Sequence, residues 1–148
     1  MSDTSPDDII ICRHDSVAFA PQPTEADLDA WAEQGVKLVI NSRTPGELAG
    51  LPFDMPSAVE SRGMSYLSLP LGGTYPATPA LTVALGKALD ETDGPVVMHC
   101  KSGMRSAHLY AAHLKSRDRS LAEPLDIIGW PGGRDAQVVA ALTVPDNG

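Results

Sequence analysis

A cysteine and an arginine five positions apart are the residues of this chain best suited to chemistry. Cys100 follows the apolar run 95–98, and four residues separate it from Arg105. A nucleophilic sulfur must be a thiolate, which is the minor form of a free cysteine at neutral pH. Unpaired backbone N–H groups at a helix start, the charge of Arg105 and a hydroxyl from Ser102 or Ser106 would favour the ionised form. The spacing therefore predicts a nucleophilic cysteine beside an anion-binding arginine.

The remaining residues of this loop are expected to bind the reacting group. Their backbone N–H groups point at the sulfur in this hypothesis, and the candidate binding residues are Lys101, Ser102, Gly103, Met104 and Ser106. His99 is expected to orient the loop through a hydrogen bond, because a sulfur that is already ionised needs no base. The Lys101 side chain either extends into solvent or adds positive field for an anionic substrate.

Strand and helix patterns alternate on both sides of the loop. The predicted elements are a hairpin at 9–20, strands at 36–40, 64–69 and 95–98, and helices at 25–34, 57–62, 79–89, 104–114 and 136–142. Thr24 and Thr78 are the predicted N-caps of the first and third helices. This alternation predicts a three-layer α/β fold with a mainly parallel central sheet, helices on both faces, and the nucleophile at a strand's carboxyl end.

The composition limits the number of domains and the classes of partner. The 148 residues are 43% hydrophobic, which suits one core, and we expect a flexible leader at 1–8 and a single catalytic domain at 9–148. A formal net charge of -8 and a pI near 4.7 argue against nucleic-acid and membrane partners. Two cysteines, no signal-peptide pattern and no long apolar run favour a reducing, cytoplasmic location.

The loop at 99–106 resembles the active-site loops of two classes of cysteine enzyme. Protein tyrosine phosphatases carry His-Cys, five residues and then Arg-Ser or Arg-Thr, whereas rhodanese-type sulfurtransferases place four residues between Cys and Arg. The present loop, with residues 101–104 between Cys100 and Arg105, has the rhodanese length.

Residues upstream of the loop extend the resemblance. Pro21-Gln22-Pro23, the stretch 35–43 and Glu47 occur in the order typical of a phosphatase-like sulfurtransferase family, found alone or beside β-lactamase-hydrolase-like (persulfide dioxygenase type) domains. The resemblance covers about 9–114. It implies a protein tyrosine phosphatase-like (dual-specificity phosphatase-like) topology and suggests a persulfide dioxygenase as a partner. It also implies a role for Arg43, Glu47 and Gln22 in lining the pocket, the alternative being that Arg43 and Glu47 form an ordinary exposed pair.

The two chemistries differ in whether they need a general acid. A phosphate ester's leaving oxygen requires a proton, which the phosphatases take from an aspartate before the cysteine strand, yet residues 64–89 contain no Asp or Glu. A leaving thiolate or sulfite departs unprotonated. The resemblances also imply that the shorter loop, with its smaller ring of N–H donors, favours one sulfur atom over a phosphate.

The sequence therefore favours a sulfurtransferase. Its Cys100 would carry a persulfide from thiosulfate or a low-molecular-weight persulfide to a thiol acceptor. One alternative is a Cys-dependent tyrosine or dual-specificity-like phosphatase with a phosphocysteine intermediate, using water or a distant acid such as Asp54 or Asp135. A second alternative is a non-catalytic module that binds an anion or a persulfide.

No cofactor or metal is expected. His108 and His113 lie five positions apart on one helix, an awkward spacing for sharing a metal ion. Cys12 is expected to be a buried strand residue, with a role as a resolving thiol as the minor alternative.

Overall fold

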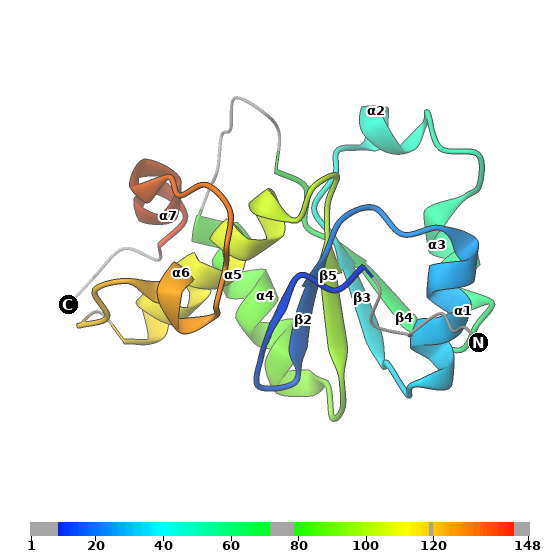
Figure 1. Ribbon diagram of the computed structural model, residues 1–148, viewed down its shortest axis with the longest axis horizontal. Helices are drawn as coiled ribbons and strands as arrows, with labels where there is room; N and C mark the ends of the chain where they lie inside the picture. The colour runs from blue at the N-terminus through cyan, green and yellow to red at the C-terminus, as the bar shows by residue number, and fades with distance from the viewer. Residues whose placement is uncertain (1–8, 72–78, 119, 144–148) are drawn as a thin grey trace.

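The computed structural model describes residues 9–71, 79–118 and 120–143. In these ranges the chain forms one sheet with helices around it (Figure 1). The elements are β1 (Cys12–His14), β2 (Val17–Ala20), α1 (Glu25–Glu33), β3 (Leu38–Asn41), α2 (Pro45–Leu48), α3 (Met55–Glu60), β4 (Ser65–Ser68), α4 (Pro79–Glu91), β5 (Val96–His99), α5 (Met104–Arg117), α6 (Pro124–Ile127) and α7 (Ala136–Leu142).

The sheet has β5 at its centre. The strand order is β1-β2-β5-β3-β4, and β1 alone among them runs antiparallel to its neighbour. Val97 of β5 pairs with Ala18 of β2 on one side and with Val39 of β3 on the other. Because the four strands from β2 to β5 are parallel, their carboxyl ends meet at one edge, where β5 delivers Cys100.

Side chains that alternate along the strands build two apolar layers. Phe19, Ile40 and Met98 belong to the cluster shared with α4 and α5, whereas Val39 and Val97 belong to the cluster shared with α1 and α3. Figure 1 shows these helix pairs on opposite faces of the sheet. The predicted three-layer fold with a mainly parallel sheet is therefore confirmed.

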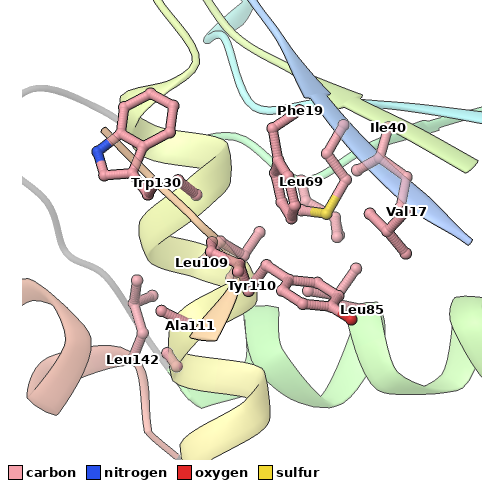
Figure 2. Packing of buried hydrophobic residues seen from close by; sticks show 14 of the residues in the cluster. Val17, Phe19, Ile40, Leu69, Leu85, Leu109, Tyr110, Ala111, Trp130 and Leu142 are labelled. Atoms are coloured by element: carbon pink, nitrogen blue, oxygen red, sulfur yellow. The ribbon is translucent and has the colours of Figure 1, made fainter. Parts of the chain in front are cut away.

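The layer on the α5 side is thick because α6 and α7 pack on the outside of α5. Figure 2 shows Phe19 of β2 close to Tyr110 of α5, and their ring centroids are 5.1 Å apart in an edge-to-face arrangement. Every residue of α5 from 106 to 113 is buried. The periodicity predicted a single buried face that included Met104, but Met104 is exposed and the helix is covered on all sides.

Two short helices were not predicted. Pro45 and Gly46 were interpreted as a break, yet α2 begins there because Thr44 and Glu47 form a capping box and Pro45 occupies the first turn. Pro124 likewise occupies the first turn of α6, but the N-cap of that helix, Glu123, makes no side-chain cap hydrogen bond. The predicted helix at 57–62 begins earlier, at Met55, because Asp54 is its N-cap. The predicted cap Thr78 lies outside the described residues.

The extent of the domain stays a prediction. The leader at 1–8 lies outside the described residues, and nothing tests the single catalytic domain at 9–148. Within the described ranges, no helix combines the length and apolar character needed to cross a bilayer.

Candidate active site

The ends of the parallel strands are joined to one another by backbone hydrogen bonds. The Gln22 N–H, beyond β2, donates to the Lys101 carbonyl over 3.3 Å. The Ser42 N–H, just beyond β3, donates to the His99 carbonyl over 2.9 Å, and the Leu71 N–H donates to the Ser42 carbonyl over the same distance. Segments following all four parallel strands thus meet around the loop that starts at Cys100.

The loop turns sharply around the cysteine sulfur. The Gly103 N–H donates to Cys100 Sγ over 3.1 Å, and the cysteine is fully buried. Gly103 is the N-cap of α5 and has φ of 94°, in the left-handed region. A Cβ at this position would lie 2.8 Å from Ile11 Cδ1 and 3.2 Å from the Trp130 ring. Both the conformation and the space require glycine here.

Several backbone donors around the sulfur have no partner in the described part of the chain. They are the N–H groups of Lys101, Ser102, Met104, Arg105 and Ser106, none of which donates a hydrogen bond to another described residue. N–H groups at a helix start point back along the helix axis, so those of Met104, Arg105 and Ser106 are available to an anion beyond the start of α5. The Ser106 hydroxyl is buried and also has no partner among the described residues.

Arg105 presents a pair of unused donors. Its Nη1 donates to Glu47 Oε1 over 2.7 Å and to the Leu71 carbonyl over 2.8 Å, while Nη2 donates to Glu47 Oε2 over 2.8 Å. These bonds use both hydrogens of Nη1 and one of Nη2. The Nε–H and the second Nη2–H lie side by side on one edge of the guanidinium and make no hydrogen bond of standard geometry to any described residue, although the nearby Cys100 sulfur contributes to the raised pKa of Arg105. This edge is a fork suited to two oxygens of a phosphate.

Glu47 holds Arg105 in place from helix α2. The Thr44 N–H donates to Glu47 Oε1 over 3.0 Å, so the capping box of α2 orients the same carboxylate that binds Arg105. The Arg105 guanidinium holds the pKa of Glu47 well below its usual range, and Glu47 raises the pKa of Arg105. Both groups are therefore charged at neutral pH.

A second arginine continues this network. Arg43 Nη1 donates to Gln22 Oε1 over 2.9 Å, and Arg43 Nε donates to Glu47 Oε2 over 3.4 Å. The Arg43 side chain is mostly buried, and the Asn41 Oδ1 accepts its backbone N–H over 2.9 Å. The structure thus brings the predicted residues Gln22, Arg43 and Glu47 into contact beside the loop.

His99 is buried beneath the sheet edge as a neutral imidazole. Burial lowers the pKa of His99 to about 4; the Cys100 backbone opposes this shift and the Arg43 charge adds to it. Neither ring nitrogen has a hydrogen-bond partner of standard geometry among the described residues. The loop-orienting hydrogen bond stays a prediction, since the Cys100 backbone is close enough to affect the His99 pKa but makes no hydrogen bond of standard geometry with the ring.

Three other singled-out residues make no hydrogen bond to the cysteine sulfur within the described part of the chain. Cys12 is on the edge strand β1, paired with Phe19, so that β2 separates it from β5; burial raises the pKa of its thiol. Asp54 accepts from the Ser57 N–H over 3.1 Å, and Asp135 accepts from the Gln137 N–H over 3.0 Å. Both carboxylates cap helices, α3 and α7 respectively.

The C-terminal segment supports the loop, which the sequence analysis did not foresee. His108 Nδ1 lies 2.8 Å from the Met104 carbonyl, and the Asp135 N–H donates to His108 Nε2 over 2.9 Å. These partners assign the proton to Nδ1. Trp130, held by a 3.0 Å bond from Nε1 to the Gly133 carbonyl, packs against Gly103. The tryptophan within a glycine-rich turn at 129–133 was the available signal.

A buried cysteine after the central parallel strand, loop N–H groups without partners in the described chain and an arginine beside them lie on a fold of the protein tyrosine phosphatase type. Solved structures support this class. Tk-PTP in its active form has a TM-score of 0.75 with 22% identity, covering 91% of this chain and 93% of that one. A phosphatase-like DUF442 protein from Shewanella putrefaciens CN-32 has a TM-score of 0.73 with 19% identity, covering 92% and 91%. At these identities the likeness shows the fold.

The family follows from the sequence comparisons. The family model of the phosphatase-like domain of β-lactamase hydrolase-like proteins matches residues 10–115, and the chain belongs to this family. A β-lactamase hydrolase-like protein of Agrobacterium fabrum is 36% identical over 99 residues, which are 66% of this chain and 23% of that protein. One from Xylella fastidiosa is 30% identical over 128 residues, 85% of this chain and 30% of that protein. The chain thus spans less than a third of these relatives.

These findings correct the prediction of sulfur transfer. The family and the structural relatives are phosphatase-like, and they favour the Cys-dependent phosphatase over the sulfurtransferase. The shorter loop between Cys100 and Arg105 was taken to favour a single sulfur atom over a phosphate. That inference was wrong because it rested on the number of residues in the loop and not on the number of hydrogen-bond donors around the sulfur. The free N–H groups and the arginine fork together offer enough donors for several phosphate oxygens, whereas one sulfur atom would leave most of them unused.

Proposed function

We propose that this domain is a Cys-dependent phosphatase that works through a phosphocysteine intermediate. The observation that carries the proposal is the donor arrangement around Cys100. Glu47 and Leu71 occupy one end of the Arg105 guanidinium and leave its Nε and Nη2 edge free. That edge and the unpaired loop N–H groups match the equatorial oxygens of a phosphoryl group, where charge lies in the transition state.

The reaction has two steps. In the first, the Cys100 thiolate attacks phosphorus, an S–P bond forms, the P–O bond to the leaving group breaks, and its electron pair departs with the leaving oxygen. In the second, water attacks phosphorus, its proton passes to solvent, and the S–P bond breaks to restore the thiolate and release inorganic phosphate. We assign to Ser106 the role of donating to the sulfur as it leaves, a role supported by a hydroxyl that is buried and has no partner among the described residues.

The remaining loop residues act through their backbones. We assign phosphate binding to the N–H groups of Lys101, Ser102, Met104 and Ser106, while Gly103 shapes the turn and already donates to the sulfur. Arg43 supports Glu47 and adds positive charge at the pocket. His99, neutral and buried, is not a base in this mechanism. The predicted sulfur donor, thiol acceptor and persulfide dioxygenase were expected for a sulfurtransferase, and a phosphatase requires none of them.

Hydrolysis of p-nitrophenyl phosphate tests the proposal. The protein is expected to release nitrophenol and phosphate, and Cys100→Ser is expected to abolish turnover while still binding inorganic orthovanadate or phosphate. Rapid acid quenching followed by mass spectrometry should find the phosphoryl group on Cys100. Turnover that survives Cys100→Ser, or no Cys100-dependent hydrolysis of any phosphoryl substrate, would overturn the assignment.

A further inference from the structure

The sequence before the cysteine strand carries no carboxylic acid in the stretch from which phosphatases take their general acid. Leu71 touches the site directly, since its carbonyl accepts from Arg105 Nη1. Yet residues 64–89, which include Leu71, contain no Asp or Glu. For sulfur transfer this absence was immaterial, but for a phosphatase it limits which leaving groups can depart.

Glu47 does not replace the missing acid. Both of its oxygens accept hydrogen bonds from Arg105, and Oε1 also accepts from the Thr44 N–H. A carboxylate clamped in this way must lose these charge-assisted bonds before it can carry a proton. It is also committed to holding the guanidinium, so a proton on Glu47 would release the residue that binds phosphate.

The other carboxylates singled out by the sequence are also engaged. Asp54 and Asp135 accept backbone N–H bonds at the starts of α3 and α7. His99 is fully buried. The imidazole of His108 is held between the Met104 carbonyl and the Asp135 N–H, with the proton on the nitrogen that faces Met104. Each of these groups is therefore either tied up in hydrogen bonds to the backbone or closed off from solvent, which argues against its serving as the proton donor.

A leaving group that is already stable as an anion needs no such proton. The phenol of tyrosine has a pKa of about 10 and an aliphatic alcohol a far higher one, so both leave poorly as anions. A phosphate released from an anhydride has a pKa of about 6, and a carboxylate released from an acyl phosphate one of about 4. A general acid typically contributes a factor of about 10²–10⁴ to rates, and mainly for the poor leaving groups.

We infer that the substrates of this site are phosphoryl donors with acidic leaving groups, that is, phosphoanhydrides or acyl phosphates rather than phosphotyrosine or alkyl phosphates. The inference rests on the proposed phosphatase function and narrows it. In the first step the S–P bond forms, the P–O bond to the leaving group breaks, and the electron pair leaves on an oxygen that stays unprotonated. Water then hydrolyses the phosphocysteine as described above.

A leaving-group series measures this directly. We would determine kcat/KM for aryl phosphates ranging from nitrophenyl to unsubstituted phenyl, and for phosphotyrosine, inorganic pyrophosphate and acetyl phosphate. We expect kcat/KM to fall steeply as the leaving group becomes more basic, with phosphotyrosine about 10²–10⁴-fold slower than the better of pyrophosphate and acetyl phosphate. If pyrophosphate reacts faster, the preferred phosphoryl donor is an anhydride; if acetyl phosphate reacts faster, it is an acyl phosphate.

Glu47→Gln separates positioning from acid catalysis. If Glu47 only orients Arg105, kcat/KM falls by the same factor for every leaving group. The slope of log kcat/KM against the pKa of the leaving group is then unchanged. If Glu47 is the acid, the loss is confined to basic leaving groups, and the inference is wrong. Asp54→Asn and Asp135→Asn are the matched controls for the other two candidate acids. In both variants kcat/KM should depend on the leaving group as it does in the unaltered protein.

The outcomes also separate this inference from the proposed function. If turnover depends on Cys100 but kcat/KM does not change with the basicity of the leaving group, the leaving-group inference is overturned and the phosphatase proposal stands. Absence of Cys100-dependent turnover for every phosphoryl donor overturns both. A steep series that disappears in Cys100→Ser supports both.

Discussion

At the scale of single residues, Gly103 controls the geometry of the sulfur. Its left-handed backbone lets its N–H reach Cys100 Sγ, and its missing side chain lets Ile11 and Trp130 close over the loop. The nucleophile therefore depends on a residue that has no chemistry of its own. It also depends on Trp130, which comes from a distant part of the chain.

Gly103→Ala should destabilise the protein and disable the site. A Cβ here is strained by the positive φ and would overlap Ile11, which together cost roughly 2–4 kcal/mol of unfolding free energy. Urea unfolding measures this loss. Gly46→Ala is the matched control, because a Cβ there meets nothing within 4 Å and Gly46 lies in a helix. That change should be neutral or stabilise by up to about 1 kcal/mol; equal losses in both variants would contradict the account.

Arg105 acts as a fork and not only as a charge. Arg105→Lys keeps the cation but loses the paired donors and the bidentate contact with Glu47. We expect kcat/KM for p-nitrophenyl phosphate to fall about 10²-fold or more, while the unfolding midpoint changes little. Rates near those of the unaltered protein would show that a point charge suffices.

At the scale of elements, the short helix α2 is the part of the fold that completes the site. Its capping box is built by Thr44 and Glu47, and the Glu47 carboxylate serves both the cap and Arg105. A helix of one turn has little stability of its own, so the ion pair with Arg105 and the cap support each other. The orientation of Arg105 is thus coupled to the start of α2, the short helix that follows β3.

Thr44→Ala tests this coupling against a matched control. Thr24 and Asp27 form the same capping box on α1, where the hydrogen bonds of Thr24 run to Asp27. Loss of either threonine should cost about 1 kcal/mol of unfolding free energy. Only Thr44→Ala should also lower kcat/KM, because only that cap orients Glu47. Equal activities in the two variants would argue that Arg105 holds Glu47 without the help of α2.

At the scale of the whole molecule, two buried histidines tie stability to pH. Burial lowers the pKa of His99 to about 4 and that of His113 to about 4, and the Arg117 charge adds to the shift of His113. An unfolded chain protonates histidine near its ordinary pKa of about 6.5. Between these values the unfolded state binds more protons than the folded state, so stability falls as the pH falls.

Urea unfolding at several pH values measures this dependence. The contribution of His99 is fully present above about pH 6.5 and is lost as the pH drops toward 4, a change of about 3 kcal/mol. His113 acts in the same direction, so His113→Gln should flatten the decline. A midpoint that stays constant from pH 7 to about pH 4.5 would contradict the burial of neutral imidazoles.

Much of this fold was predictable because its signals are local. The β1–β2 hairpin, the cap at Thr24, the strand before Cys100 and the final helix at 136–142 all follow from short-range patterns. Helix α5 was predicted with one buried face, because the sequence does not show that α6 and α7 would cover its outer side. Helix α2 was missed because Pro45 and Gly46 were interpreted as a break in the chain, although Thr44 and Glu47 have the spacing of a capping box.

The sequence by itself was enough to single out Cys100, Arg105 and the glycine between them as candidate site residues, since all three lie within one turn and the start of one helix. Only the tertiary structure decided what surrounds them. Glu47 and Arg105 are 58 positions apart, and parallel strands bring them together at one sheet edge. That contact leaves one edge of the guanidinium free, and the number of donors left for a ligand depends on partners that are distant in the chain. The choice between one sulfur atom and a phosphate therefore could not be made from the length of the loop.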